Sequence, residues 1–191
     1  MRNLIFLFLL LPIGLLAQRD SVYVKTDIFT AVYSEVLQQP KWVTYTVQCS
    51  NGKTSRVGMD FYTVPDIITS DNADYVDNVY DKGHCAPAAD FNCTKEMLYK
   101  TFSYVNCVLQ NQYLNRGVWR LLEAYERDLA ATTGVTVKIK MVYSNTSIKL
   151  PTGATVPDGF YKFITYNNKV EKYYFPNTKP TTSDFKKYLI K

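Results

Sequence analysis

The sequence contains a single histidine, His84, among its 191 residues. An HExxH metalloprotease motif, a zinc site built on several histidines and a histidine acid–base pair each need at least two, so all three are excluded. The chain also lacks a P-loop, a GxGxxG motif and a GxSxG nucleophile elbow. If His84 is catalytic, we expect it to act alone as a base, with a pKa near the working pH, beside groups that stabilise charge.

Long apolar runs are absent after the first residues. Arg2 precedes an apolar run from Leu4 to Leu16, which ends in Ala17-Gln18. This pattern is typical of a secretory signal peptide, and the run is shorter than the roughly 20 residues of a membrane span. We expect a signal peptide over residues 1–17, cleavage after Ala17 and a secreted or periplasmic protein; a retained N-terminal anchor is the alternative.

The remaining residues, 18–191, are predicted to form a single domain. Loss of Arg2 lowers the net charge from +5 to about +4, which permits a polyanionic partner without demonstrating one. Cysteine is scarce, and an even number in a secreted chain permits two disulfides with three possible pairings. The sequence leaves the pairing open, and the spacing does not match a CxxC zinc signature. The cysteines are Cys49, Cys85, Cys93 and Cys107.

The pattern of apolar residues predicts an α+β fold with a central antiparallel sheet, because strands dominate and no βαβ alternation is present. Residues 20–41 have weak periodicity and are expected to wrap the surface, and residues 63–80 to form a long loop. Turn signals at Asn51-Gly52 and Asn167-Asn168 predict two hairpins. The predicted strands are 42–48, 54–57, 135–143, 160–166 and 170–175.

Asn115–Ala131 is the clearest predicted helix, and Gly134 supplies a stop signal after it. At about 100° per residue, one arc forms a core-facing stripe and a second arc lies beside it. The stripe contains Val118, Leu121, Leu122, Tyr125 and Leu129, and the second arc contains Asn115, Trp119, Glu123 and Glu126.

The stretch YDKGHCAPAADFN, residues 80–92, surrounds the single histidine. Gly83 permits unusual backbone angles or a close approach to a ligand, Lys82 places a cation beside His84, and Pro87 stiffens the chain. These residues alone fit a catalytic base and a tight structural turn equally well.

A second cluster, residues 106–127, adds neutral amides and a carboxylate. The side-chain oxygens of Asn106, Gln110 and Asn115 are of the kind that binds water, phosphate or a hard cation. Glu123 follows Asn115 by about two helical turns, close to the same face. The structural alternatives are a helix N-cap for Asn115 and a solvated position for Glu123.

Together the two clusters resemble the DNA/RNA non-specific endonucleases with the ββα-metal finger. That family has a D-R-G-H motif followed by A-P and a later Asp, and here Asp81-Lys82-Gly83-His84, Ala86-Pro87 and Asp90 correspond to it. The resemblance continues through Phe102, Asn106, Gln110, Leu114-Asn115-Arg116-Gly117, Trp119, Leu122-Glu123 and Glu126-Arg127. It includes Trp42–Tyr45, Arg56, Val156–Lys162 and Phe175–Asn177, so it covers most of the mature chain.

The resemblance implies a ββα-metal active site with His84 on a strand or loop and Asn115 at the start of the long helix. His84 would be the general base, Asn115 the direct ligand of one Mg²⁺, Mn²⁺ or other divalent cation, and Glu123 a ligand through water. The implied supporting roles are catalytic support by Asn106, phosphate binding by Arg56, Lys82 and Gln110, and structural support by Asp81 and Gly83.

The chain departs from the family at several places. Lys82 replaces the usual arginine and lacks its bidentate fork, and Leu109 replaces a proline before Gln110. A further helix and strand usual at the C-terminus are absent after Phe185–Lys191, so the chain is expected to be naturally short or truncated.

The resemblance therefore implies a secreted, metal-dependent endonuclease that hydrolyses DNA and RNA with little sequence preference, through contacts to phosphate and sugar. The main alternative is a secreted nucleic-acid-binding or interaction domain of the same fold with weak or no activity. A third reading is a phosphodiesterase for small or sugar-linked phosphates, which would share the site.

Overall fold

A computed structural model describes residues 17–49 and 51–190. The predicted signal peptide lies almost wholly outside the described residues. Within the described part of the chain, no helix combines the length and the apolarity needed to cross a bilayer.

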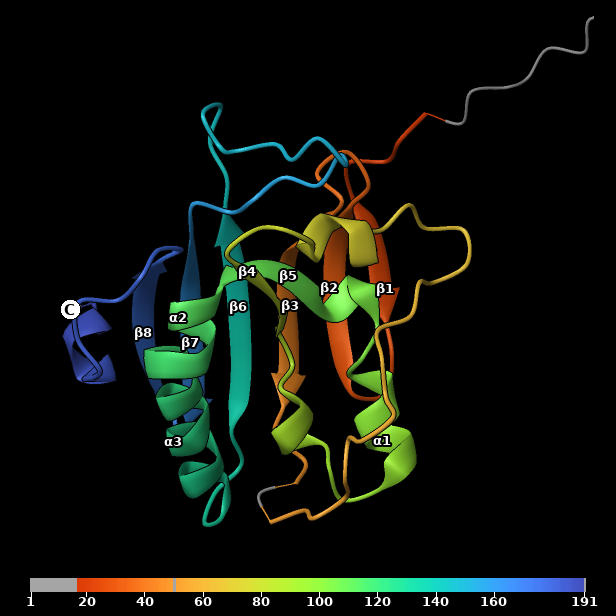
Figure 1. Ribbon diagram of the computed structural model, residues 1–191. Coiled ribbons are helices and arrows are strands. Elements are labelled where there is room, and N and C mark those ends of the chain that lie inside the picture. Colours follow the sequence, from red (N-terminus) through yellow and green to blue (C-terminus); the bar gives the residue numbers. More distant parts are fainter. Residues whose placement is uncertain (1–16, 50, 191) are drawn as a thin grey trace, which may run out of the picture.

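Six antiparallel strands form one sheet in the order β1-β2-β3-β6-β7-β8, which Figure 1 shows from one face. The central antiparallel sheet predicted from the sequence is confirmed. The strands are β1 (Val22–Lys25), β2 (Phe29–Ser34), β3 (Gln39–Thr46), β6 (Thr136–Val142), β7 (Gly159–Tyr166) and β8 (Lys169–Pro176).

The first half of the sheet differs from the sequence prediction. Residues 20–41, expected to wrap the surface, contain β1, β2 and the start of β3. Inward-facing Phe29, Ala31 and Tyr33 alternate along β2, but the small Ala31 weakens the apolar signal. The strand predicted at 54–57 does not form, because the Cys49–Cys93 disulfide and the backbone hydrogen bond from Thr54 to Asn92 tie this segment to another part of the chain.

The second half agrees closely with the prediction. β6, β7 and β8 fall within one or two residues of the predicted strands. Asn167 and Asn168 join β7 to β8 with φ values of 45° and 58°, as a two-residue hairpin turn with two left-handed residues requires.

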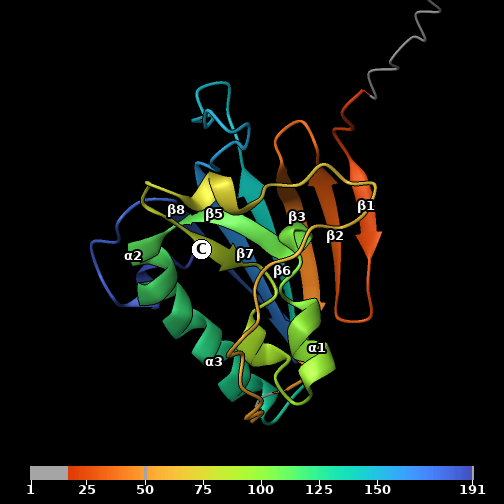
Figure 2. The ribbon, with the colours of Figure 1, turned by 45° about the vertical axis from the view of Figure 1, so that its right-hand side comes forward.

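A second layer of short elements lies on one face of the sheet (Figures 1 and 2). In it, β4 (Tyr80–His84) pairs antiparallel with β5 (Cys107–Asn111), and a helical segment follows β5 directly. The apolar pattern did not predict β4, β5 or the helix α1 (Lys95–Lys100), although the family resemblance placed His84 on a strand or loop. The 3-10 turns of the chain are η1 (Asn72–Tyr75), η2 (Ala88–Asp90), η3 (Tyr104–Asn106) and η5 (Phe185–Tyr188).

The long helix begins earlier than predicted and is interrupted. It consists of α2 (Gln112–Leu114), the π-helical segment η4 (Asn115–Trp119) and α3 (Arg120–Ala130). Gly117 has non-helical angles inside η4. The side chain of Asn111 caps the helix by accepting from the amides of Tyr113 and Leu114. The N-cap alternative for Asn115 is therefore wrong.

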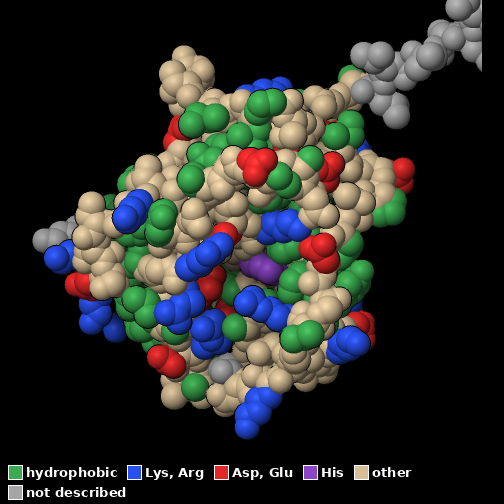
Figure 3. Space-filling model, in the orientation of Figure 1, with side chains coloured by type: hydrophobic (Ala, Val, Ile, Leu, Met, Phe, Trp, Pro, Cys, Tyr) green, Lys and Arg blue, Asp and Glu red, His purple; other side chains and the backbone are tan. Residues whose placement is uncertain are grey.

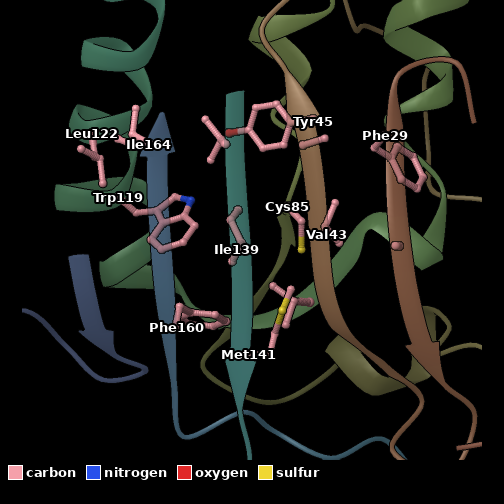
Figure 4. Close-up of a cluster of buried hydrophobic side chains, with 14 of the residues drawn as sticks. Phe29, Val43, Tyr45, Cys85, Trp119, Leu122, Ile139, Met141, Phe160 and Ile164 are labelled. Carbon is pink, nitrogen blue, oxygen red and sulfur yellow. The ribbon is translucent and has the colours of Figure 1, made fainter. Parts of the chain in front are cut away.

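The core lies between the sheet and this second layer (Figure 4). Val118 and Leu122 are buried there as the predicted stripe requires, and Tyr125 and Leu129 pack at its edge. Trp119 and Glu126, which were predicted to lie beside the stripe, are also buried. Glu126 can be buried because Lys162 of β7 lies 2.7 Å from its carboxylate, a pairing that apolar periodicity does not reveal.

One disulfide forms, between Cys49 and Cys93, whose Cα atoms are 5.7 Å apart. Cys85 and Cys107 are free thiols and both are buried. Only one of the two disulfides that the even cysteine count permits is therefore present.

Candidate active site

The site is built on a strand–strand–helix unit. His84 is the last residue of β4 and pairs with Cys107 at the start of β5. Asn115 lies one turn into the helix that follows β5. The two side chains therefore line the same cavity, of about 760 Å³, although 31 residues separate them in the sequence.

Basic side chains surround this cavity. Figure 3 shows the histidine in a hollow with Lys and Arg side chains around it. The one acidic residue among those lining the cavity is Glu123. The basic residues that line it are Arg56, Lys82, Arg116, Arg120 and Arg127.

His84 is held between aromatic rings. The centroids of Phe61 and Phe102 lie 4.7 Å and 4.8 Å from the imidazole. The Nε2 atom is buried and has no hydrogen-bond partner among the described residues. Burial, with a smaller contribution from the positive charge of Arg56, lowers the pKa of His84 to about 3. The expectation of a pKa near the working pH is therefore wrong for the free protein, and the imidazole is neutral at pH 7.

Asn115 is oriented by Asp81. Its Nδ2 donates to Asp81 Oδ2 at 2.9 Å. A carboxylate accepts only, so the amide nitrogen of Asn115 must face Asp81 and the amide oxygen is left free. Arg116 donates two further bonds to Asp81, at 2.9 Å and 2.6 Å. Asp81 thus joins β4 to the helix and fixes the direction of the Asn115 amide.

Glu123 lies on α3 and lines the cavity with Asn115. Burial raises its pKa to about 7, and the neighbouring Glu126 adds to the rise while Lys162 and Arg127 oppose it. Asp90 has a pKa raised to about 8, chiefly by burial, although Arg127 donates to it at 2.9 Å. Glu123 is half-buried on the cavity wall, so it is neither a fully solvated helix residue nor a core residue.

Asn106 is fully buried and does not line the cavity. Its Oδ1 accepts from the amide of Ala86 at 2.8 Å, and its Nδ2 donates to the carbonyls of Ala86 and Thr101. These bonds hold the chain just after His84. The structure therefore places Asn106 as a positioning residue.

Gln110 lies apart from the predicted phosphate contacts. It is fully buried, and it is absent from the cavity wall. Its side chain lies across Gly83, where a Cβ atom would come within 2.5 Å of Gln110 Oε1. Glycine is needed at position 83 because of this close approach. Its backbone angles do not require glycine, since its φ lies outside the left-handed region. A direct role of Gln110 in phosphate binding does not fit this position.

The two remaining phosphate candidates do line the cavity. Arg56 is exposed, and its side chain makes no hydrogen bond or ion pair within residues 17–49 and 51–190. Lys82 Nζ donates to Asp60 at 3.1 Å and to Asn72. Arg56 is therefore free to bind an anion, whereas Lys82 must exchange existing partners.

A model of the family described as DNA/RNA non-specific endonuclease matches residues 12–191. The chain belongs to the DNA/RNA non-specific endonuclease family. The resemblance noted from the sequence is confirmed.

Members of this family and related structures are similar to the chain over different lengths. The mitochondrial nuclease EXOG of Danio rerio is 32% identical over 102 residues, which are 51% of this chain and 30% of that protein. A nuclease of Nostoc sp. is 28% identical over 129 residues, 61% of this chain and 47% of that protein. The chain thus spans less than half the length of these curated relatives.

A solved structure of this fold is similar over most of the chain. The crystal structure of the EndoG/EndoGI complex has a TM-score of 0.78 and 24% identity, covering 88% of this chain and 80% of that one. At this identity the likeness shows the fold, an α+β arrangement of the ββα-metal type.

Three arginines of this family member were not singled out from the sequence as residues of the site. Arg116, Arg120 and Arg127 line the cavity, and their spacing of 4 and 7 residues places them on one helix face with Glu123. That helical periodicity could have identified them from the sequence. No sequence pattern indicated the aromatic packing around His84, because Phe61 belongs to an irregular segment.

Proposed function

We propose that the protein is a secreted endonuclease that hydrolyses phosphodiester bonds of DNA and RNA with little sequence preference. The observation that carries the proposal is that His84 lines one cavity together with Asn115, Glu123 and five basic side chains. A polyanionic backbone is the substrate that such a lining attracts. Contacts to phosphate and sugar carry little sequence information, which accounts for the broad preference.

A hydrated divalent cation fits the donor set at Asn115 and Glu123. The bond to Asp81 leaves the amide oxygen of Asn115 free, and Asn115 and Glu123 both line the cavity. No cluster of three His, Cys, Asp or Glu side chains suited to a metal occurs in the described part of the chain. One direct oxygen ligand and several waters suit Mg²⁺, which dehydrates reluctantly. When bound, the cation would stabilise charge on the phosphoryl group and the leaving oxygen.

The residues of the site have separate roles in the proposed reaction. His84 accepts a proton from water, and the resulting nucleophile attacks phosphorus in line with the leaving 3′ oxygen. Arg56 binds the phosphate, and Glu123 would orient water at a bound cation. Asp81 and Asn106 hold Asn115 and the chain after His84 in place.

Secretion is part of the proposal. The pattern of residues 1–17 and the Cys49–Cys93 disulfide fit an oxidising compartment. Recovery of the protein from the medium or periplasm with Gln18 at its N-terminus tests this, and recovery with Met1 intact in the cytosol contradicts it.

Cleavage is tested with purified protein, plasmid DNA and RNA, with and without magnesium. We expect EDTA-sensitive cleavage of both, lost in His84→Ala and retained in Lys149→Ala, a control on a loop outside the cavity. Equal absence of cleavage in wild type and His84→Ala, with salt-dependent binding, would instead support a binding domain without turnover. The hydrogen bonds from Lys82 to Asp60 and Asn72 favour a binding domain without turnover, because they hold Lys82 away from a substrate phosphate.

A further inference from the structure

The face of the sheet opposite the cavity carries a regular array of side chains. Residues paired across neighbouring strands point to the same face, so the strand register defines rows. One row on this outer face is Tyr23, Val32, Trp42, Lys140, Tyr161 and Tyr174, and the next is Lys25, Thr30, Thr44, Lys138, Phe163 and Lys172. We call these two rows the outer sheet face.

The outer sheet face is accessible. Tyr23 is 64% exposed, and Lys138 and Lys140 are exposed. Trp42 and Tyr161 are half-buried and, with Lys140, line a hollow of about 560 Å³. The helices α1, α2 and α3 lie on the other face, where the core is (Figures 1 and 2).

Aromatic rings and lysines alternate on this face. Lys138 Nζ lies 4.9 Å from the centre of the Trp42 ring. Lys172 Nζ lies 5.0 Å from the Tyr161 ring and 5.7 Å from the Phe163 ring. Each ammonium group is thus close to a ring and has no carboxylate partner among the described residues.

The charge of the face has one sign. The outward positions of the six strands, as far as the structure describes them, carry lysines and no Asp or Glu. Asp20 lines the rim of the hollow, but its carboxylate already accepts from Lys41 and Ser34. The face is therefore suited to an anionic partner that also offers flat π-surfaces.

We propose that the outer sheet face binds single-stranded nucleic acid, with bases stacked on Trp42 and Tyr161 and phosphates bound by Lys138 and Lys172. Single strands expose both bases and phosphates, and base stacking on aromatic side chains beside cations is how sequence-tolerant sites hold them. Trp42 and Tyr161 are two strands apart, at about 10 Å, which gives room for separate bases. A duplex hides its bases, and a neutral polysaccharide does not use the lysines.

This binding is independent of the proposed cleavage. The outer sheet face and the cavity lie on opposite sides of the sheet, so one long strand could occupy both. Such two-site attachment raises the effective concentration of the strand at the cavity. We expect the binding to exist in a protein that does not cut.

The direct test is photo-cross-linking. A 20-nucleotide single-stranded DNA carrying 5-iododeoxyuridine is irradiated with the His84→Ala protein in EDTA, so that cleavage does not occur. Cross-linked peptides are located by mass spectrometry. We expect cross-links at Trp42 and Tyr161, and cross-links confined to the cavity would overturn the proposal.

Variants give the matching affinities, measured by fluorescence anisotropy in the same background. Trp42→Ala/Tyr161→Ala should weaken single-strand binding about tenfold or more. Lys138→Glu/Lys172→Glu should also weaken it and reduce the slope of log K against log salt by about 1.4, or 0.7 per phosphate. The matched charge control is Lys186→Glu/Lys187→Glu on η5, where both lysines are exposed.

The outcomes separate the competing explanations. Equal weakening in the η5 control would show general electrostatics and overturn the proposal. A wild-type dimer in sedimentation that Trp42→Ala converts to monomer would assign the face to a second copy and also overturn it. Circular dichroism reports whether each variant is folded. If Trp42→Ala/Tyr161→Ala unfolds, the cross-links of the His84→Ala protein, whose outer sheet face is unaltered, decide the test. If only the cleavage assay fails, the conclusions from cross-linking and binding affinity are unaffected.

Discussion

Asp81→Asn tests whether one carboxylate sets the direction of the Asn115 amide. Asp81 accepts from Asn115 Nδ2 and from two nitrogens of Arg116, and its side chain is 17% exposed. An asparagine at this position has one acceptor oxygen and one NH₂ group. Either orientation of it sets the NH₂ group against a donor of Asn115 or Arg116, so the Asn115 oxygen is no longer fixed toward the cavity.

The size of the effect follows from this loss of orientation. Removing groups that orient a metal ligand costs about 10–100-fold in metal affinity or activity, which is about 1.4–2.7 kcal/mol at 1.36 kcal/mol per factor of ten. We expect magnesium affinity, measured by titration calorimetry, and kcat/KM on DNA to fall by that factor together. Stability should change little, since the site is at the surface of the cavity.

Arg116→Ala is the matched control. It removes two of the three bonds to Asp81 but keeps the bond from Asn115. We expect it to raise KM through the lost positive charge while magnesium affinity stays within a few-fold of wild type. If Asp81→Asn binds magnesium and cleaves DNA within twofold of wild type, the assignment of Asp81 as the positioning residue is refuted.

Three further changes test the fold and its charges. Replacing Cys49 and Cys93 by alanine opens a loop with a sequence separation of 44 and should lower the free energy of unfolding by up to about 4 kcal/mol in urea titrations; an unchanged value contradicts a stabilising role. Lys162→Met leaves Glu126 buried without its partner at 2.7 Å and should cost about 3–5 kcal/mol, with much of it regained in the double variant Lys162→Met/Glu126→Leu; no recovery would argue against the ion pair as the cause. The folded-state pKa of His84 lies below its usual 6.5, at about 3, so its contribution to stability is present above pH 6.5 and is lost as the pH falls toward 3. Unfolding of wild type compared with His84→Ala should show a difference that shrinks by about 2 kcal/mol from pH 7 to pH 5, and a constant difference contradicts the low pKa.

The sequence predicted the parts of the fold whose signals are local. The Asn167-Asn168 turn and the alternation along β6 give a clear hairpin and strand. β5 was missed because all five of its residues are buried, so it has no alternation. The strand pattern of β4 is weaker still, because Gly83 has no side chain and Lys82 is polar.

The site was predictable in its residue types but less so in its geometry. The motif spacing indicated that His84, Asn115 and Glu123 belong to one site, and in the structure they line one cavity. It could not place Gln110, because the direction of that side chain depends on the pairing of Asp81 with Gln110 across β4 and β5. Nor could it reveal that Asp81 fixes the Asn115 amide, which requires β4 to lie beside the helix.

The low pKa of His84 links base strength to substrate binding. Burial is the larger cause of that low value and Arg56 the smaller one, and the Arg56 side chain is free to bind an anion. A phosphate placed between Arg56 and His84 would offset the positive charge and raise the pKa of the imidazole. Lys82 would contribute less, since Asp60 already neutralises it at 3.1 Å. For the proposed reaction, this would make the imidazole a weak base in the free protein and a stronger one once a phosphate backbone is bound, so that proton transfer from water would be favoured in the complex.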